Sequence, residues 1–292
     1  MVDKPQGWTS HAVVAAARKW LGTQRIGHLG TLDPRATGVL PLAVRSATKL
    51  VPFMGSERKG YIGTIVLGSR TDTLDADGEV IERFDGALPN ENRIAEALGE
   101  FIGPIEQIPP MYSAVKQAGV ALHRIAREGR EVERAPKAVR IDRFEIVSYA
   151  EPLLEIEVDC SAGTYVRTLA DDLGTSLGCG AHLQSLRRTR SGPFVLDQAT
   201  KVERLADEAS NDRLDQRVIP PVKALGLPIV QLGPEEARRV ANGCEIGSAS
   251  KLAPGGRVAA VEPGGELLAV MEILPGRRLH PLRVLSPVAA AR

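Results

Sequence analysis

The stretch Gly27-His28-Leu29-Gly30-Thr31-Leu32-Asp33-Pro34-Arg35-Ala36-Thr37-Gly38 decides how this sequence is interpreted. Its glycines allow positive φ angles and a close approach of the backbone to a ligand. Pro34 restricts the residue before it to extended conformations, which stiffens the position of the Asp33 carboxylate. Polar side chains such as His28 and Arg35 flank that carboxylate. An Asp-Pro pair in a Gly-rich loop is more often a plain turn, so this stretch needs support from other segments.

The segments around this loop have helical and strand periodicity. A helix is predicted to start at Thr9 or Ser10, which can cap it, and to stop at Gly22. A second strong helix carries a continuous apolar face and ends before Gly178. On the same grounds we predict helices over residues 10–21, 47–54, 91–102 and 165–177, and strands over residues 39–44, 61–67, 79–84, 139–147 and 153–159.

Residues 107–137 follow neither pattern. A long segment with little apolar periodicity is typical of a functional excursion rather than of a core element. The basic residues in it are Lys116, Arg124, Arg127, Arg130, Arg134 and Lys137.

A domain boundary is predicted near Gly226. The stretch from Val218 onward contains Pro220-Pro221, and beyond it one short helix is followed by short strands separated by glycine pairs. This texture predicts a small β-barrel of roughly 65 residues. The predicted domains are therefore residues 1–226 and residues 227–292.

The composition argues against several classes of protein. No stretch approaches about 18 consecutive apolar residues, so no membrane span is predicted. The three cysteines contain no C-x-x-C spacing, which fits reduced thiols in a cytosolic protein. The acidic turn at residues 72–78 resembles a calcium loop, but Phe84 stands where the bidentate acid is needed. The histidines lack metal-site spacing and no nucleotide-binding glycine motif occurs, so we expect no metal and no cofactor.

The formal net charge is only +1, but the charges form blocks along the chain. Residues 1–60 contain nine Lys and Arg against three Asp and Glu, and residues 111–143 contain eight against four. Residues 61–110 and 144–180 are acidic. Such blocks can fold into a basic face that binds a polyanion, or they can be ordinary solvated surface.

Arg167 lies next to the apolar face of its predicted helix, so its charge needs a partner if it is buried. Asp33 is one candidate, because a guanidinium can hold a carboxylate in place and keep it ionised. The alternative is an exposed Arg167 that pairs with Asp171 one turn later.

Two further motifs combine aromatic, apolar and basic side chains. Lys59 and Tyr61 begin a predicted strand, where the ring could stack on a base or be partly buried core. Residues 182–188 are predicted to form a strand that presents Leu186 to a pocket and two arginines to phosphates. The alternative is an ordinary charged strand end.

Taken together, these motifs resemble the TruB family of tRNA pseudouridine synthases. The resemblance implies an α+β catalytic domain on a mixed, mainly antiparallel sheet flanked by helices, followed by a PUA-like β-barrel. It also implies that residues 107–137 are an RNA-binding thumb. The likeness covers about residues 2–200, and its motifs occur in the family's order at residues 3–7, 27–38, 59–61, 70–73, 75–78, 163–169 and 186–188.

The same resemblance implies roles for individual residues. Asp33 corresponds to the nucleophile, Tyr61 to the tyrosine stacked on the target base, and Arg167 to the arginine paired with the nucleophile. His28 corresponds to the residue that fills the gap left by the flipped nucleotide. The other residues expected to contact the uridine or the surrounding RNA are Tyr165, Leu186, Lys4, Gly30, Thr31, Lys59, Lys116, Arg124, Arg127, Arg187 and Arg188.

The substrate implied by the resemblance is uridine 55 in the T loop of tRNA, modified in the cytoplasm. Pseudouridine formation breaks the glycosidic bond, rotates the uracil and rejoins it through C5, without a cofactor. An ionised Asp33 could add to the sugar or the base. Tyr61 is the candidate acceptor of the C5 proton. Flipping the uridine should cost a few kcal/mol, offset by stacking on Tyr61 and insertion of His28.

Three rival interpretations follow from these motifs. Dyskerin, the guide-RNA-dependent relative, shares the Asp loop, but the short N-terminus and the C-terminal domain favour a stand-alone enzyme without an obligate protein partner. A tRNA-folding chaperone is compatible with the same RNA-binding surface. A glycoside hydrolase needs two carboxylates, and no second acid accompanies Asp33 in these motifs.

Overall fold

The computed structural model describes residues 1–54, 58–113, 115–117, 119–247 and 253–285 of the chain. The chain folds into two compact units, each assembled from three segments. The first unit comprises Met1–Val13, Gly30–Pro41 and Ser56–Val202, and the second comprises Val14–Leu29, Leu42–Gly55 and Glu203–Arg292. The second unit takes segments from both sides of residue 226, so the predicted boundary there stays a prediction.

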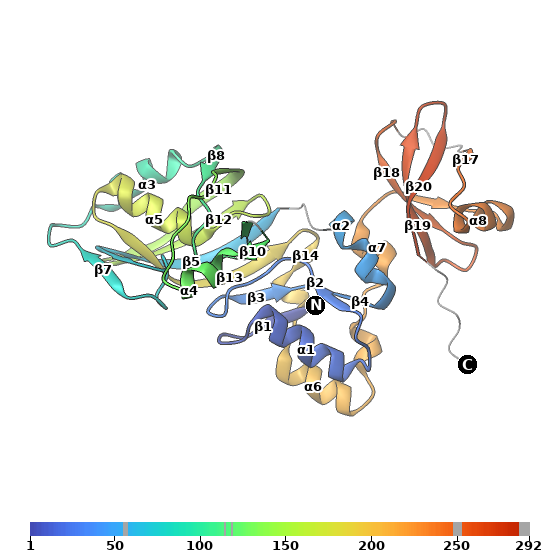
Figure 1. Ribbon diagram of the computed structural model, residues 1–292, viewed down its shortest axis with the longest axis horizontal. Coiled ribbons are helices and arrows are strands. Elements are labelled where there is room, and N and C mark those ends of the chain that lie inside the picture. The colour runs from blue at the N-terminus through green and yellow to red at the C-terminus, as the bar shows by residue number, and fades with distance from the viewer. Residues whose placement is uncertain (55–57, 114, 118, 248–252, 286–292) are drawn as a thin grey trace. The chain divides into compact units, whose positions relative to one another are not determined.

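The first unit is built on a nine-stranded sheet with the order β15-β1-β3-β13-β5-β12-β11-β8, and β14 pairs with β13 (Figure 1). The pairs β1–β15 and β3–β13 are parallel, and the other neighbours are antiparallel. The predicted mixed, mainly antiparallel sheet is confirmed. The strands are β1 (Val2–Lys4), β3 (Thr37–Leu40), β5 (Lys59–Leu67), β8 (Gly103–Gln107), β11 (Lys137–Ala150), β12 (Leu153–Cys160), β13 (Ala181–Ser191), β14 (Phe194–Val195) and β15 (Thr200–Lys201).

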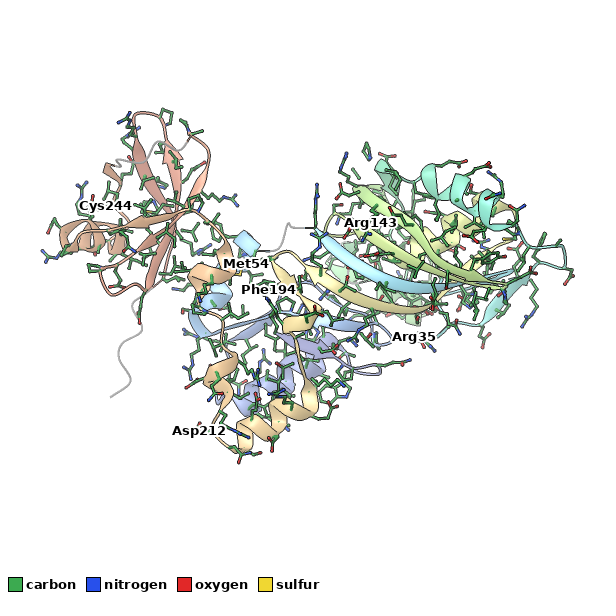
Figure 2. The ribbon with its side chains drawn as sticks, turned by 180° about the vertical axis from the view of Figure 1, so that it is seen from behind. Arg35, Met54, Arg143, Phe194, Asp212 and Cys244 are labelled. Carbon is green, nitrogen blue, oxygen red and sulfur yellow. The ribbon has the colours of Figure 1, made fainter. Side chains whose placement is uncertain are left out.

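Two helices cover one side of this sheet. The helix α5 (Val166–Leu177) packs against β13 and against α3 (Glu91–Gly99), which in turn packs against β11. The apolar stripe of α5 is buried, and the helix ends at Gly178, whose φ is 73°. The exposed side of β11 and β12 carries charges instead, where Arg143 pairs with Glu157 and, at 3.1 Å, with Asp159 (Figure 2). The sheet therefore has one apolar and one charged side, as period-two strands allow.

Two excursions leave the first unit's sheet. The hairpin of β6 (Ser69–Thr71) and β7 (Val80–Arg83) follows β5. The second excursion contains β9 (Lys116–Gln117), β10 (Val120–Ala121) and α4 (Leu122–Arg127), with Leu122 and Ile125 buried. It begins and ends where Gln107 of β8 pairs with Lys137 of β11.

The second unit contains a separate five-stranded sheet with the order β16-β18-β19-β20-β17. Its core is formed by fully buried residues such as Val258, Met271 and Leu279, and the sheet is PUA-like as predicted. The elements of the second unit, in chain order, are β2 (Ile26–His28), β4 (Leu42–Val44), η1 (Arg45–Leu50), α2 (Val51–Met54), η3 (Leu214–Arg217), α7 (Pro221–Leu225), β16 (Ile229–Gln231), α8 (Pro234–Ala241), β17 (Ile246–Gly247), β18 (Arg257–Val261), β19 (Leu267–Leu274) and β20 (Arg278–Val284). The helices α1 (Ser10–Trp20) and α6 (Val202–Ser210) contribute residues to both units, and η2 (Leu196–Gln198) belongs to the first.

Most predicted elements are present with ends shifted by one to three residues, but two predictions need correction. The predicted strand at residues 39–44 is two strands, because Pro41 has no N–H to donate to a ladder. Its first part, β3, belongs to the nine-stranded sheet, whereas β4 pairs with β2 in the second unit. The predicted helix at residues 47–54 is the 3-10 helix η1 followed by the short α2. Within the described residues, every helix is too short or too polar to cross a bilayer.

Candidate active site

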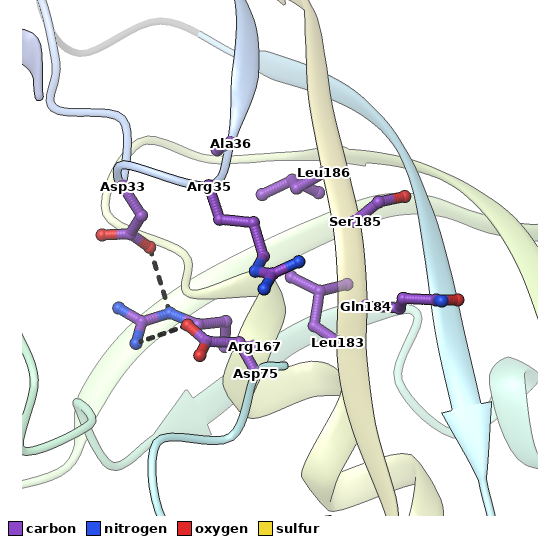
Figure 3. Close-up of a pocket in the computed structure, with 9 residues that line it drawn as sticks. All are labelled: Asp33, Arg35, Ala36, Asp75, Arg167, Leu183, Gln184, Ser185 and Leu186. Atoms are coloured by element: carbon purple, nitrogen blue, oxygen red, sulfur yellow. Dashed lines mark ion pairs between the residues drawn. The ribbon is translucent and has the colours of Figure 1, made fainter. Parts of the chain in front are cut away.

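Arg167 is the centre of a buried cluster of polar groups in the first unit (Figure 3). Its side chain is only 6% exposed, and its Nε lies 3.0 Å from Oδ2 of Asp33. Its Nη1 lies 3.3 Å from Oδ2 of Asp75 and donates to the carbonyl oxygen of Thr73. Its Nη2 donates to the carbonyl oxygen of Tyr112 at 3.0 Å. The predicted ion pair between Asp33 and Arg167 is therefore present, and every nitrogen of the guanidinium has an acceptor.

The competing interpretation of Arg167 as a solvent-exposed partner of Asp171 is wrong. Asp171 instead receives two hydrogen bonds from Arg70, at 2.7 and 3.1 Å. This bidentate pair joins α5 to β6 and leaves the guanidinium of Arg167 to the carboxylates of Asp33 and Asp75.

Asp75 is a functional candidate that the sequence analysis missed. Its Oδ1 accepts hydrogen bonds from the Thr73 hydroxyl at 2.7 Å and the Asp77 backbone N–H at 3.1 Å, and its Oδ2 pairs with Arg167. The acidic turn rejected as a calcium loop thus holds a carboxylate against the same arginine that pairs with Asp33. The statement that no second acid accompanies Asp33 is therefore wrong. Oδ1 of Asp75 already accepts two hydrogen bonds and Oδ2 is ion-paired with Arg167, which leaves the carboxylate poorly placed to act on water.

The surroundings of Asp33 act on its carboxyl in opposite directions. Burial raises the pKa of Asp33, Arg167 and Lys4 lower it, and the nearby Asp75 adds to the rise. The net direction is upward, although the side chain is 42% exposed towards the pocket. The expectation that Arg167 keeps Asp33 ionised is thus only one part of the balance, because partial burial opposes the guanidinium.

Two buried cations anchor the loop that carries Asp33. Lys4 is 0% exposed and Arg188 is 1% exposed. Both were expected to contact RNA, and the structure corrects this, because both side chains are buried and donate to backbone carbonyls, and Arg188 is also hydrogen-bonded to the Tyr61 side chain. The acceptors are the carbonyl oxygens of Pro5, Trp8 and Pro34 for Lys4, at 3.0, 2.6 and 3.1 Å, and those of Gly30, Thr31 and Val39 for Arg188, at 3.1, 3.3 and 2.7 Å.

Lys59 is also buried rather than facing RNA, since its ammonium donates to the Ser191 hydroxyl at 2.9 Å and the residue is 5% exposed. Tyr61 is 8% exposed, and burial raises the pKa of its phenol, with the nearby Arg188 opposing the rise. A phenol with a raised pKa stays protonated at neutral pH. The structure therefore argues against Tyr61 as the acceptor of the C5 proton.

A shallow pocket opens beside the ion pair. Four consecutive residues of β13 line it because the strand has a register shift between Leu183 and Ser185, and such a bulge re-aims the side chains next to it. The lining residues are Asp33, Arg35, Ala36, Asp75, Arg167, Leu183, Gln184, Ser185 and Leu186 (Figure 3).

The structure brings some of the remaining predicted residues to this site and not others. Leu186 lines the pocket. Tyr165 stands at the start of α5, where its hydroxyl interacts with Ser113 and burial raises its pKa. Arg187 is 41% exposed on its side chain and bonded to Asp3 and Thr37.

The others lie at the surface or away from the cluster. Thr31, Lys116 and Arg124 are exposed, and Gly30 has a φ of 104° in the Asp33 loop. The side chain of Arg127 lies outside the described part of the chain. His28 is in β2 of the second unit, so its expected role beside the flipped nucleotide stays a prediction. Among the described residues, no group of three or more His, Cys, Asp or Glu side chains could hold a metal ion.

The family models for the TruB family pseudouridylate synthase N-terminal domain and the tRNA pseudouridylate synthase B C-terminal domain match residues 18–166 and 167–225. The chain belongs to the TruB family. The border between the two TruB models falls inside α5, so Asp33 and Arg167 come from different models and meet only in the folded unit.

TruB relatives match nearly the whole chain. The tRNA pseudouridine synthase B of Geobacter sulfurreducens is 42% identical over 300 residues, which cover 98% of both chains. That of Rhodococcus jostii is 43% identical over 292 residues, covering 98% of this chain and 93% of the relative. A chain of a Cbf5-Nop10-Gar1 complex has a TM-score of 0.75 at 28% identity, covering 97% of this chain and 83% of that one. A chain of an H/ACA RNP bound to a substrate RNA containing 2′-deoxyuridine has a TM-score of 0.76 at 26% identity, covering 98% and 84%.

Proposed function

We propose that this TruB chain converts uridine 55 in the T loop of tRNA to pseudouridine, with Asp33 as the nucleophile. The observation that carries the proposal is the ion pair of Asp33 and Arg167 at the edge of a pocket. The relatives that match nearly the full chain are tRNA pseudouridine synthases, which supports tRNA as the substrate.

The proposed reaction needs a nucleophile whose position is fixed while its charge stays available. Arg167 orients one oxygen of Asp33, and the exposed part of the carboxyl faces the pocket. The ionised carboxylate adds to the sugar or the base. In the net reaction the N1–C1′ bond breaks and a C5–C1′ bond forms, while the proton lost from C5 is replaced by one gained at N1. Atoms are conserved, so the proposal needs no redox partner and no cofactor.

Side chains around the pocket suggest how a uridine would be held. Leu186 lines the pocket and would pack against the uracil. Tyr61 remains the proposed stacking partner of the base, but it is no longer proposed as a proton acceptor. A base inside a folded T loop must be flipped out to reach this depth, and His28 is proposed to occupy the vacated space.

The exposed basic residues of the 107–137 excursion are the proposed contact with the T arm. Lys116 and Arg124 are both exposed there, and basic side chains of this kind bind the phosphate backbone. We further propose that the chain acts in the cytoplasm without an obligate protein partner or guide RNA. Chaperone activity on tRNA is proposed as a consequence of the same binding.

The test is to incubate the purified chain with an unmodified tRNA and with a bare T-arm hairpin, and to map pseudouridine in both. We expect conversion at position 55 alone, and none in a tRNA with cytidine at that position. Conversion that requires an added guide RNA or protein would contradict the stand-alone proposal. Absence of pseudouridine, or its appearance at a different uridine, would contradict the proposed function.

The nucleophile is tested with Asp33→Asn, which keeps the size of the side chain but removes its charge. We expect no detectable pseudouridine while the tRNA dissociation constant stays within about threefold of wild type, because the substitution removes chemistry rather than binding. The matched control is Asp85→Asn, at an exposed aspartate, and it should have wild-type activity. Turnover by Asp33→Asn close to wild type would exclude Asp33 as nucleophile.

A further inference from the structure

Gln107 is a buried polar residue that the proposed reaction does not use. It is the last residue of β8 and is 1% exposed. Its pairing with Lys137 marks the point where the 107–137 excursion leaves and re-enters the sheet. Any group fixed to Gln107 is therefore fixed to the base of the excursion.

The side chain of Gln107 forms a closed pair of hydrogen bonds with the backbone of Tyr165. The Tyr165 N–H donates to Oε1 of Gln107 at 3.0 Å, and Nε2 of Gln107 donates to the Tyr165 carbonyl oxygen at 3.2 Å. Tyr165 is the N-cap of α5, and its own side chain makes no capping hydrogen bond. The amide of Gln107 therefore fixes the place where α5 begins, two residues before Arg167.

Other contacts from the base of the excursion reach the same two residues. The carbonyl oxygen of Tyr112 accepts from Nη2 of Arg167 at 3.0 Å, and Ser113 interacts with the hydroxyl of Tyr165. On the returning side, Nζ of Lys137 lies against Gly163, in the turn that leads into Tyr165. Both ends of the excursion thus border the start of α5.

We propose that Gln107 is a positioning residue for the catalytic ion pair. By holding the Tyr165 peptide it sets the start of α5, and through α5 the position of the Arg167 guanidinium against Asp33. This inference rests on the proposed function of the Asp33 site. Gln107 itself lies outside the pocket lining and acts through the main chain of Tyr165. The same hydrogen bonds join the base of the proposed RNA-binding thumb to the ion pair.

The test compares Gln107→Met, which has similar length but no hydrogen-bonding amide, with Gln107→Glu, which keeps an acceptor for the Tyr165 N–H. The matched control is Glu106→Met, at an exposed neighbour on the opposite face of β8. Single-turnover rates, tRNA dissociation constants and the dependence of rate on pH are measured for each variant. Small displacements at a reacting centre cost up to about 100-fold in rate, so we expect a loss of about 10- to 100-fold for Gln107→Met. Gln107→Glu should be intermediate.

A positioning role makes two further predictions that a purely structural role does not. The rate should fall by a larger factor than the tRNA dissociation constant rises, since Lys116 and Arg124, the proposed phosphate contacts, are untouched. The acid limb of the pH profile should move to higher pH in Gln107→Met, because a displaced Arg167 opposes the protonation of Asp33 less. Glu106→Met should match wild type in all three measurements.

A folded Gln107→Met variant with the wild-type rate would overturn the inference, and so would a slower variant whose acid limb does not move. If Gln107→Met does not fold, Gln107→Glu decides the question by the same criteria. Failure of the proposed function has a different signature, because wild type itself would then form no pseudouridine in tRNA.

Discussion

At the scale of single residues, Asp33 is held in a balance between burial and two cations. The carboxyl is half-buried, its pKa is raised by that burial and by Asp75, and Arg167 and Lys4 act in the opposite direction. Lys4 is affected in turn, because burial lowers its pKa to about 8 while Asp33 opposes that shift. The fold therefore disfavours the ionised form of the Asp33 carboxyl, and Arg167 and Lys4 offset part of that effect.

This balance predicts how stability depends on pH. A pKa that is higher in the folded than in the unfolded state means that the fold disfavours ionisation of Asp33. The resulting loss of stability is absent below the unfolded pKa and grows as the pH rises through the folded pKa. Asp33→Asn never ionises. We therefore expect the free energy of unfolding of Asp33→Asn to rise relative to that of wild type between pH 4 and pH 7.5, as measured by urea unfolding. A variant that loses stability relative to wild type as pH rises would show that Arg167 and Lys4 outweigh burial.

At the scale of elements, the position of Arg167 depends on how closely α5 packs against β13. Gly174 faces the start of β13, and a Cβ there would overlap backbone atoms of Gly180 and Ala181. Backbone atoms cannot rotate away, so the closeness of this contact requires glycine. Gly99 in α3 is the opposite case, because a Cβ there would meet no atom within 4 Å.

These two helical glycines predict opposite effects of one substitution. Gly174→Ala should lower the free energy of unfolding by about 1–3 kcal/mol, as overpacked sites do, because α5 has to move away from β13. Gly99→Ala should leave it unchanged or raise it by up to about 1 kcal/mol, since alanine is the better helix former. Chemical denaturation of both variants checks the difference. Equal effects in the two helices would mean that propensity, and not packing, determines the cost at Gly174.

The sequence was sufficient to predict the elements whose pattern is local. The helix that carries Arg167 follows from its apolar stripe, and the pairing of Arg167 with Asp33 followed from a charge next to that stripe. The role of Asp75 was not predictable in this way, because it depends on the acidic turn meeting β13, where the Ala76 N–H donates to the carbonyl of Leu183. Such a long-range contact has no periodicity to reveal it.

The wrong prediction for Arg188 has a different cause. Adjacent residues of a strand point to opposite faces, so Arg187 and Arg188 could not both face phosphates. The structure leaves Arg187 partly exposed and buries Arg188 beneath the Asp33 loop. The strand period alone predicts that the two arginines face opposite sides of the sheet. It does not predict which backbone carbonyls accept hydrogen bonds from the buried one.

At the scale of the whole molecule, positive and negative charges nearly balance. The net charge is +1, and many of the described arginines pair with acids of their own surface, as Arg93 does with Glu96. Lys116 and Arg124 are exposed in the 107–137 excursion. Binding to tRNA would then depend on where the basic groups stand and not on overall charge.

This arrangement predicts the salt dependence of tRNA binding. Replacing both Lys116 and Arg124 by alanine should weaken binding and reduce the slope of log K against log salt by about 1.5, because each lost phosphate contact removes roughly 0.7–0.9. Arg93→Ala should leave the slope unchanged. Titrations at several salt concentrations measure both. An unaltered slope in the double variant would place the RNA contact elsewhere on the chain.

The way Arg188 anchors the Asp33 loop has a consequence for how this protein can diversify. Its guanidinium donates to the main-chain oxygens of Gly30 and Thr31 in the loop and of Val39 in β3, and the side chains of these residues contribute nothing to the bonds. Thr31 is exposed, so its side chain can change under other pressures, such as the shape of the RNA it meets, without releasing the anchor, whereas the side chain of Val39 is fully buried in the core. The anchor itself depends on Arg188 and on Gly38, where a Cβ would overlap the backbone of Arg188.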